Sequence, residues 1–588
     1  MRGLVMSRRG AVALALLLLA CDAPAVVSDG GEDAGVGDAG PEPCSVEGTT
    51  ECTPDGYAVR ACEGGSWRVV THCMREEGRL CEDAACVDPW RVGDPSFDAC
   101  SGEPRGTTET LSEKAAYYDE IAARVHVHPT LRWLAPVRLR DGANEATASV
   151  DDVAQWYTGE NDGLWSALYL ASQAYRYAVT RDADALANLR VLMEGEAARM
   201  RITGVPGIFT RQMIPPDVPG IACPADAIEY VPDPEKDDNQ WVRIGTGGCL
   251  EVVDGATMDW TTTTHCGLEE FAGWCFLDNV SKDEYAGHVF ALGAVARLVD
   301  DVAVRGLAAD MLGQLADHLR DNAMTLVDWD GRPTEHGRFY ASAFDDFPGF
   351  NAAMALSFFA TAAHATGRAD LRGFYEQCLL QSGGISACID QPTERPRSYL
   401  DHLAAAGVYI GEEGCASNFN NISMHFLSLY GLLAYEREPA RRERVQASLA
   451  EVVWAPEGMP RAAQHQHNAW FDFMWASHKR LGAGSDGPAL EAVRDGACML
   501  RQFPASYAHR EVPLPSSFTP YCTDRFGDPV SEHPREVADR CAATFVWWRD
   551  PYQLDETCAD DPLRLEVPTG YLLAYWMGRY HGFLPDDG

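Results

Sequence analysis

Apolar positions along this chain of 588 residues recur at helical spacing, in pairs of segments separated by short polar turns. In the stretch 162–179, Leu, Trp, Tyr and Ala fall on one side of a helix, and a second amphipathic segment begins after the turn at 180–183. The pattern predicts helical hairpins over 162–179 with 184–200, 282–298 with 302–322, 349–366 with 369–381, 420–435 with 440–452, and 467–481 with 488–501. The single helices predicted at 111–124 and 569–580 could close a sixth pair.

Hairpins that alternate an inner and an outer helix about six times resemble the (α/α)6 toroid of the six-hairpin glycosidases. No run of alternating strand-like positions rivals the helical pattern, so the sequence predicts an all-α toroid domain over residues 100–588. An α-solenoid of helix pairs is the alternative. It is less favoured because the pairs lack a fixed period and long insertions separate them.

Two insertions, 212–280 and 502–566, interrupt the helices and carry several of the 19 cysteines. Setting Cys21 aside leaves an even number, which fits disulfides in an exported protein. The cysteines up to Cys100 and those from Cys223 onward are each odd in number. We therefore predict that Cys100 pairs within the large domain and that three bridges stabilise a small cysteine-rich module at 44–99, which is too short to fold on its apolar core alone.

The N-terminal segment predicts export. Arginines precede an apolar run at 11–20 that is too short to span a bilayer, the layout of a signal peptide over 1–21. The run ends in Leu18-Leu19-Ala20-Cys21, which resembles the lipobox of bacterial lipoproteins. This resemblance implies lipidation of Cys21 and attachment to the cell envelope, either at the outer membrane or at the cell surface. Residues 22–43, rich in small residues, prolines and acids, predict a flexible tether.

Composition narrows the choice of partners. The formal net charge is -39, from 87 acidic and 48 basic residues, and such a surface repels nucleic acid. The 15 tryptophans suit a carbohydrate-handling protein, because aromatic faces stack on sugar rings, although most would serve in the core.

Polar side chains cluster at the starts of the predicted inner helices. In a toroid these helices run parallel, so their N-termini meet at one end of the ring, where free amides favour anions. Asp162, Asp283, Glu284 and His288 are the candidate catalytic residues. The candidate substrate-binding residues are Asn161, Arg211, Asn421, His425 and His467. Helix capping is the competing explanation for any one of them.

A pair of carboxyls at helix starts suits glycoside hydrolysis, in which one protonated carboxyl delivers a proton and an ionised one activates water. Asp162 with Asp283 or Glu284 is the favoured pair. Glu284 and His288 lie four residues apart on one helical face and could bind each other or a metal. His126-Val-His128 and His465-Gln-His467 lack partners at ligand spacing, so we predict no metal and no cofactor.

The segments at 161–169, 281–288, 328–334 and 571–580 resemble a family of exported, myxobacterial-type lipoproteins, over residues 110–580. This resemblance implies the toroid and carries over no catalytic residue. The unsaturated glucuronyl hydrolases share the toroid and use one aspartate, a part that Asp162 or Asp283 could play, although their motif is not matched.

The sequence therefore predicts a surface-anchored glycoside hydrolase that binds a glycan. One alternative is a polysaccharide lyase in which Tyr285 or His288 abstracts a proton. The other is a non-catalytic glycan-binding or scaffold lipoprotein.

Overall fold

The computed structural model describes residues 43–53, 58–72, 80–82, 84–87, 109–224, 230–231, 236, 238–254, 256–343, 348–389, 397–478, 487–554 and 559–584. The expected signal peptide, the lipidation site Cys21 and almost all of the expected tether lie outside these residues.

Helical hairpins are the main elements of the chain after residue 109, as the sequence predicts. The hairpins are α3 (Asp162–Thr180) with α4 (Ala183–Arg201), α5 (Lys282–Leu298) with α6 (Val302–Asp321), α7 (Pro348–Thr366) with α8 (Ala369–Phe374), α11 (Phe419–Tyr435) with α12 (Pro439–Ser448), and α13 (Ala469–Ala476) with α14 (Gly487–Arg501). The first helix, α2 (Leu111–Ile121), packs on the last, α15 (Thr569–Tyr580). Three of the outer helices, α2, α8 and α12, continue into π-helical turns at Ala122–His126, Tyr375–Leu379 and Leu449–Trp454.

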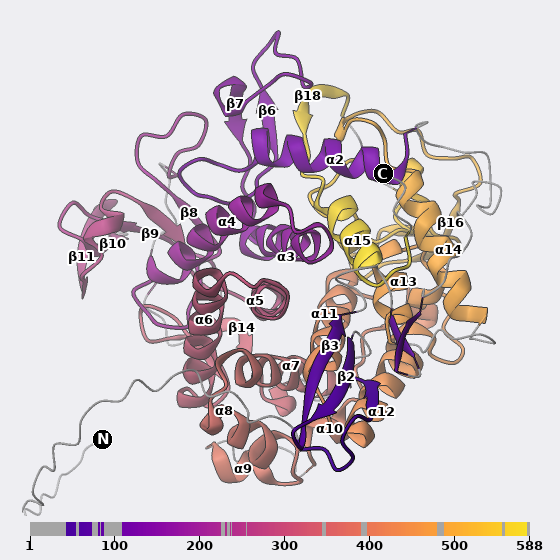
Figure 1. The fold of residues 1–588 in the computed structure, drawn as a ribbon. Helices are drawn as coiled ribbons and strands as arrows, with labels where there is room; N and C mark the ends of the chain where they lie inside the picture. The colour runs from indigo at the N-terminus through magenta and orange to yellow at the C-terminus, as the bar shows by residue number, and fades with distance from the viewer. Residues whose placement is uncertain are drawn as a thin grey trace, which may run out of the picture. The chain divides into compact units, whose positions relative to one another are not determined.

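Within the described residues, the inner helices contact one another in a closed circuit. Helix α3 contacts α5, α5 contacts α7, α7 contacts α11, α11 contacts α13, α13 contacts α15, and α15 returns to α3 (Figure 1). Helix α5 also contacts α11 across the circuit. A closed circuit agrees with a toroid rather than a solenoid, in which each repeat contacts only its neighbours.

Burial explains which helices lie inside. Every residue from Pro348 to Ala363 of α7 is buried, and a helix that is apolar on all sides must be surrounded by protein. Helix α6, in contrast, buries one face and exposes charged residues on the other. The difference follows from the sequence, in which the inner segments carry few charges.

The expectation of an all-α domain is wrong for the two insertions and for other connections between helices, which contain strands. The first insertion forms a sheet in the order β11 (Asp259–Cys266), β10 (Cys249–Asp254), β9 (Trp241–Ile244), β12 (Cys275–Leu277) and β8 (Gln212–Ile214). A second sheet has the order β15 (Ala508–His509), β18 (Asp561–Leu565), β6 (Val137–Leu139) and β7 (Val153–Trp156). Two hairpins, β13 (Thr325–Val327) with β14 (Pro333–Arg338) and β16 (Pro520–Thr523) with β17 (Pro529–Ser531), complete the strands of the helical domain. Apart from β11, these strands have at most six residues, and β8 and β12 are buried on both faces, so the strands leave no long alternating run in the sequence.

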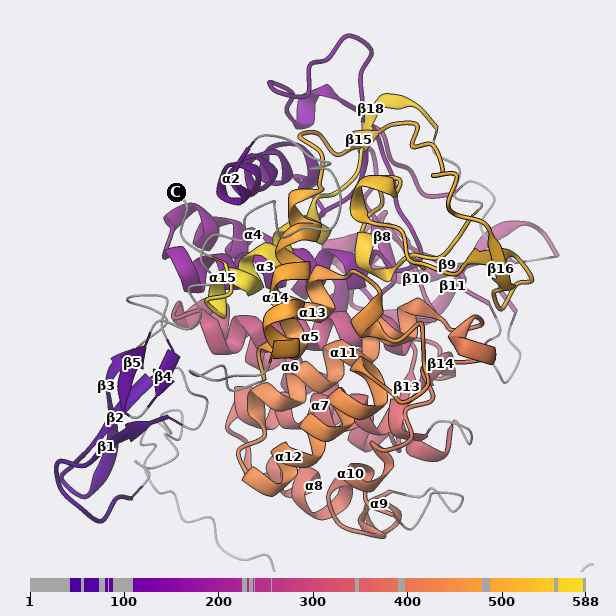
Figure 2. The ribbon, with the colours of Figure 1, turned by 90° about the vertical axis from the view of Figure 1, so that its right-hand side faces the viewer.

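The connections place the insertions at one end of the ring. Each turn from an inner to an outer helix is short where the structure describes it, such as 181–182, whereas returns to the next inner helix are long, such as 202–281. Strands β8–β11, β13, β14, β16 and β18 accordingly gather on one side of the helices (Figure 2). We call this end, where the inner helices begin, the mouth.

Disulfides stabilise the insertions. Cys223–Cys275 and Cys249–Cys266 lie in the first insertion, Cys378–Cys388 follows α8, and Cys415–Cys522 ties the loop before α11 to β16. Disulfides of this kind fit an exported protein. Among the described residues no helix is long and apolar enough to cross a membrane.

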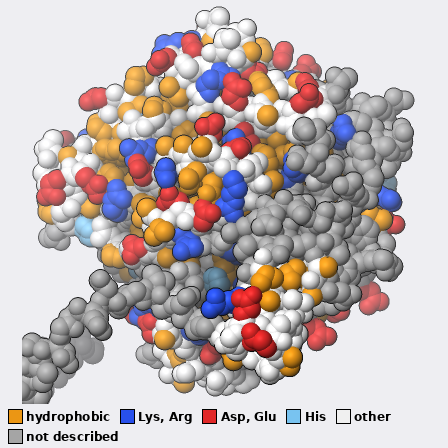
Figure 3. Space-filling model, in the orientation of Figure 1, with side chains coloured by type: hydrophobic (Ala, Val, Ile, Leu, Met, Phe, Trp, Pro, Cys, Tyr) orange, Lys and Arg blue, Asp and Glu red, His pale blue; other side chains and the backbone are white. Residues whose placement is uncertain are grey.

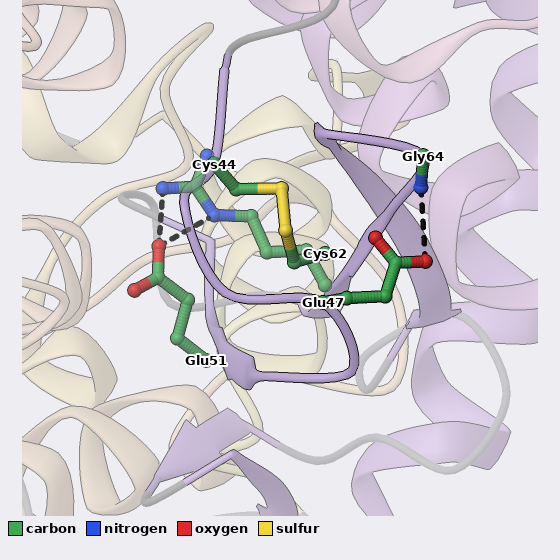
Figure 4. Close-up of a disulfide and its surroundings, with 6 residues drawn as sticks. Cys44, Glu47, Glu51, Cys62 and Gly64 are labelled. Atoms are coloured by element: carbon green, nitrogen blue, oxygen red, sulfur yellow. Dashed lines mark hydrogen bonds and ion pairs between the residues drawn. A yellow bond between two sulfur atoms is a disulfide. The ribbon is translucent and has the colours of Figure 1, made fainter.

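The small module contains the sheet β1 (Thr50–Cys52), β2 (Ala58–Glu63) and β3 (Ser66–His72), and the hairpin of β4 (Leu80–Glu82) with β5 (Ala85–Val87). Cys44–Cys62 and Cys52–Cys81 are two of the bridges expected there. Beside the first, Glu47 accepts a hydrogen bond from the Gly64 amide at 3.1 Å and Arg60 binds Glu51 (Figure 4). Cys100, expected to pair within the large domain, lies outside the described residues.

Charged side chains of both signs occupy the surface. On the face in Figure 3, Lys and Arg side chains lie among the acidic ones. The acidic excess of the chain is therefore not a uniform acidic surface on that face.

Candidate active site

The first turns of α3 and α5 meet at the mouth. The Leu164 amide donates a hydrogen bond to Oε2 of Glu284 at 3.2 Å. A Cβ at Gly163 would lie 2.1 Å from the same oxygen and 2.8 Å from Nε2 of His288. Only glycine allows the two helices to approach this closely. The fold thus brings together the two polar segments that the sequence singles out, 161–163 and 283–288.

Asp283 is a half-buried acceptor held by three segments. Its Oδ2 accepts hydrogen bonds from Nδ2 of Asn161 at 3.1 Å and from Nδ2 of Asn420 at 3.0 Å, and its Oδ1 accepts one from Ser281. These partners suit an ionised carboxylate, which only accepts hydrogen bonds. The contacts also tie the starts of α3 and α11 to the start of α5.

Asp162, the first residue of α3, lies in a very different environment. Its Oδ1 accepts a hydrogen bond from the Gly159 amide at 2.7 Å, whereas its Oδ2 is buried without a partner. Burial raises the pKa of Asp162 to about 8, with a further contribution from the charge of Glu284, although Arg199 and the Gly159 amide oppose the rise. Asp162 is therefore protonated at neutral pH.

Glu284 and His288, on the same helix as Asp283, are buried in the interior. Both side chains are 0% exposed, and Oε2 of Glu284 lies 3.6 Å from Nε2 of His288. The other ring nitrogen of His288 binds Glu196 of α4, and the ring stacks on Phe209 with centroids 4.0 Å apart. Burial raises the pKa of Glu284. Burial alone would lower the pKa of His288, but Glu196 and Glu284 outweigh it and raise the pKa. Neither residue can touch a substrate in this conformation.

Arg199 on α4 supplies positive charge to the buried carboxyls of Glu196, Glu284 and Asp162. Its guanidinium stacks 3.7 Å above the Trp133 ring and donates a hydrogen bond to the backbone oxygen of Arg211 at 3.1 Å. Its Nε and Nη2 have no hydrogen-bond partner. Burial lowers the pKa of Arg199, while Glu196, Glu284 and Asp162 oppose that change. Arg199 thus faces three carboxyls, those of Glu196, Glu284 and Asp162, and Arg211 adds a second positive charge near Glu284.

Arg211 lies at the edge of the mouth, just before β8. Its Nε donates a hydrogen bond to the backbone oxygen of Asn279 at 2.7 Å, and its Nη1 donates one to Oδ1 of Asn161 at 3.0 Å. Asn161 therefore bridges Arg211 and Asp283 through the two ends of its amide. Through Arg211 and Asn161, the first insertion is connected by hydrogen bonds to Asp283.

Three predicted binding residues, namely His425, Asn421 and His467, make no hydrogen bond or ion pair with Asp162, Asp283 or Glu284 among the described residues. His425 on α11 is buried with both ring nitrogens unpartnered, and burial lowers its pKa to about 3. Within the described residues the side chain of Asn421 makes no hydrogen bond, and its neighbour Asn420 reaches Asp283 instead. His467, before α13, binds Asp495 of α14 at 2.8 Å, and this partner raises its pKa.

The sequence interpretation missed Asn420, Glu196, Arg199 and Lys282. Lys282 is buried beside Asp283, donates hydrogen bonds to Oδ1 of Asn351 at 3.2 Å and the Arg338 backbone oxygen at 3.1 Å, and has its pKa lowered by burial to about 7. A polar first turn was a usable signal for Asn420 and Lys282. Nothing in the pattern of α4 distinguishes a buried Glu196 or Arg199 from a surface charge.

Across the described part of the chain, no group of three or more His, Cys, Asp and Glu side chains is arranged to hold a metal ion.

Comparisons with known proteins give only distant likenesses. No protein-family model matches the chain, and no curated protein matches it. A metagenome-derived glycoside hydrolase family 9 endoglucanase has 13% identity and a TM-score of 0.34, with 81% of this chain and 80% of that chain covered. The cellulase Cel9M of C. cellulolyticum has 12% identity and a TM-score of 0.33, over 81% and 98%. The glycoside hydrolase family 9 endoglucanase J30 has 12% identity and a TM-score of 0.35, over 89% and 92%. At these TM-scores the likeness establishes neither the family nor the activity of this chain.

Proposed function

We propose that the chain is an exported glycoside hydrolase whose general acid is Asp162 and whose general base is Asp283. The contrast between these two carboxyls carries the proposal. Burial keeps Asp162 protonated, with its pKa raised to about 8, whereas Asp283 accepts hydrogen bonds from Asn161 and Asn420. Environments that make one carboxyl a proton donor and another an acceptor are what hydrolysis of a glycosidic bond needs.

In the proposed reaction, Asp162 protonates the glycosidic oxygen while the bond between that oxygen and the anomeric carbon breaks. Asp283 takes a proton from a water molecule whose oxygen bonds to the same carbon from the opposite face. One water is consumed and the anomeric configuration inverts. Proton exchange with solvent then restores both carboxyls. Because Oδ2 of Asp162 is enclosed, substrate entry has to displace the groups that cover it.

The test measures reducing ends released from β-1,4-glucan, β-1,4-xylan, β-1,4-mannan and α-1,4-glucan. Asp162→Asn and Asp283→Asn should each lower kcat at least about 100-fold, the usual contribution of a general acid or base. Asp184→Asn is the matched control, because Asp184 is an exposed aspartate in the first turn of α4. Full activity of either variant on a polymer that the wild type hydrolyses would refute its role. Proton NMR of the first product reports whether the anomeric configuration inverts.

A glycan-binding scaffold without catalysis is the second candidate. The complete burial of Glu284 and His288 favours it, because these polar side chains then serve packing and charge balance. The burial of both Tyr285 and His288 disfavours the lyase alternative, in which one of them abstracts a proton. The Tyr285 hydroxyl donates a hydrogen bond to the Gly207 backbone oxygen at 2.7 Å and accepts one from the Phe209 amide at 3.2 Å, and burial raises its pKa well above the usual value.

We further propose that Cys21 is lipidated and anchors the protein to the cell envelope, at the outer membrane or the cell surface. The support is the lipobox-like Leu18-Leu19-Ala20-Cys21, which lies outside the described residues. Inhibition of signal peptidase II should leave the precursor unprocessed. Normal processing under inhibition would refute the anchor and leave the hydrolase proposal untouched.

A further inference from the structure

A cavity of about 560 Å³ lies on the sheet of the first insertion, and none of its lining residues belongs to the proposed acid and base. Its volume falls within the roughly 300–1,000 Å³ of pockets that take small ligands. The residues that matter for its chemistry are Pro215, Pro216, Asp217, Arg243, Thr246 and Glu251. The cavity therefore combines apolar rings with charged and hydroxyl groups.

The alternation of β9 and β10 aims two charged residues away from the core. Val242, Ile244 and Leu250 are buried in the hydrophobic cluster beneath the sheet. Arg243 and Glu251 are directly opposed across the two strands and half-buried, on the other face. Since successive side chains of a strand point to opposite faces, both charged groups stand on the side that the cavity covers.

The side chains of Arg243 and Glu251 pack against neighbouring residues, and their polar atoms remain available to a ligand. The Arg243 guanidinium lies 4.1 Å over the Trp260 ring. Oε1 of Glu251 lies against Gly245, where an added Cβ would come within 2.1 Å of it. Counting only described residues, neither side chain forms an ion pair or a hydrogen bond, although they are cross-strand neighbours. A donor fork and a carboxylate acceptor thus stand on neighbouring strands with no hydrogen-bond partner among the described residues.

We infer that this cavity binds one end of a neutral oligosaccharide, an inference that rests on the proposed glycoside hydrolase function. Neighbouring sugar hydroxyls both donate and accept hydrogen bonds, so a guanidinium beside a carboxylate can serve them. The exposed Pro216 offers an apolar ring to the face of a sugar, and the buried Pro215 supports it from below. Arg243 is balanced by Glu251, and Asp217 adds negative charge, so an anionic glycan is disfavoured.

Chain connectivity joins this cavity to the candidate active site. Arg211, which binds Asn161, directly precedes β8, and Pro215 directly follows it. Three extended residues span roughly 10 Å. The cavity is therefore positioned to hold part of a glycan that continues toward Asp162 and Asp283. Cys223–Cys275 ties the cavity wall to β12, which limits the ordering that binding requires.

The test measures binding of cellohexaose, xylohexaose, mannohexaose and maltohexaose by calorimetry to the full chain carrying Asp283→Asn, which prevents turnover. Arg243→Leu or the isosteric Glu251→Gln is added to this background and should weaken binding of the preferred hexasaccharide at least about tenfold. Glu270→Gln is the matched control, because Glu270 is an exposed glutamate of the same insertion that pairs with Arg201. It should leave the Kd within about twofold.

The outcomes separate this inference from the proposed function. Unchanged affinity in both Arg243→Leu and Glu251→Gln would overturn the inference, as would failure of all four hexasaccharides to bind. Binding that depends on Arg243 and Glu251 in a protein whose wild type hydrolyses no glycan would support the cavity and refute the hydrolase proposal. Hydrolysis that depends on Asp162 and Asp283, together with unchanged affinity in the cavity variants, would do the reverse.

Discussion

Replacing Asp162 by Asn should stabilise the folded protein near pH 8 and abolish the proposed catalysis. Asp162 titrates at 3.8 in an unfolded chain, and burial raises its pKa to about 8 in the fold. Below the lower value the carboxyl is protonated in both states. Between the two values the folded protein binds a proton that the unfolded chain does not, so the free energy of unfolding falls as the pH rises. Each pKa unit corresponds to about 1.4 kcal/mol, so the loss reaches roughly 5 kcal/mol across this window.

An asparagine has no such dependence and keeps the acceptor for the Gly159 amide. The difference in unfolding free energy between Asp162→Asn and wild type should therefore grow by roughly 5 kcal/mol from pH 4 to pH 8. Urea unfolding at several pH values, with disulfides intact and tryptophan fluorescence as the signal, measures it. Asp184→Asn, at an exposed helix start, should change stability by less than about 0.5 kcal/mol. A constant difference for Asp162→Asn across the pH range would refute the buried, protonated carboxyl.

Three further changes test neighbouring parts of the structure. Lys282→Met should stabilise the fold at pH 6, because burial lowers the lysine pKa from 10.5 to about 7 and the folded protein carries the charge at a cost below that pH. Urea unfolding should show this gain shrinking by roughly 4 kcal/mol between pH 6 and pH 10. Gly163→Ala should lower the free energy of unfolding by about 2–4 kcal/mol, because the added Cβ would overlap the Glu284 carboxylate. The control Gly306→Ala in α6, where an added Cβ meets nothing within 4 Å, should raise it by about 0.5–1 kcal/mol in the same assay. Removing the Cys415–Cys522 bridge by paired serine substitutions should lower stability by about 2–5 kcal/mol, read from the unfolding midpoint without reductant.

The helices were predictable because each inner segment is apolar over its whole length and is followed by a short polar turn. Helix α7 begins one residue before its predicted start, and α5 has its predicted bounds. Helix α13 was predicted to reach residue 481 but ends at Ala476, because no proline or glycine marks a stop in the sequence before Gly482. The strands of the first insertion were not predicted. Strands β8 and β12 have three residues each and are buried on both faces, and the alternation in β9 and β10 covers only four and six residues.

The candidate site was predictable only to the level of helix starts. Segments 161–163 and 283–288 do meet, as parallel inner helices require. The sequence could not choose between Asn420 and Asn421, because the side chain that reaches Asp283 depends on the rotation of α11 about its axis. On α5, the sequence favoured Glu284 and His288 as site residues. They share one face of the helix, as expected, but that face is buried in the interior. Helical periodicity reports which residues share a face and leaves open which face is buried.

The electrostatics of Asp162 distinguish the two functional candidates. In a purely structural site, asparagine would accept the same hydrogen bond from the Gly159 amide without the cost of a carboxyl whose second oxygen is buried and unpartnered. An aspartate is required only if its proton is used. If Asp162→Asn gains stability and leaves glycan binding intact while hydrolysis is lost, that cost serves proton transfer, as is common where enzymes hold groups away from their ordinary pKa. If Asp162→Asn gains stability and the wild type hydrolyses nothing, the same aspartate has no catalytic purpose and the scaffold candidate is the better one.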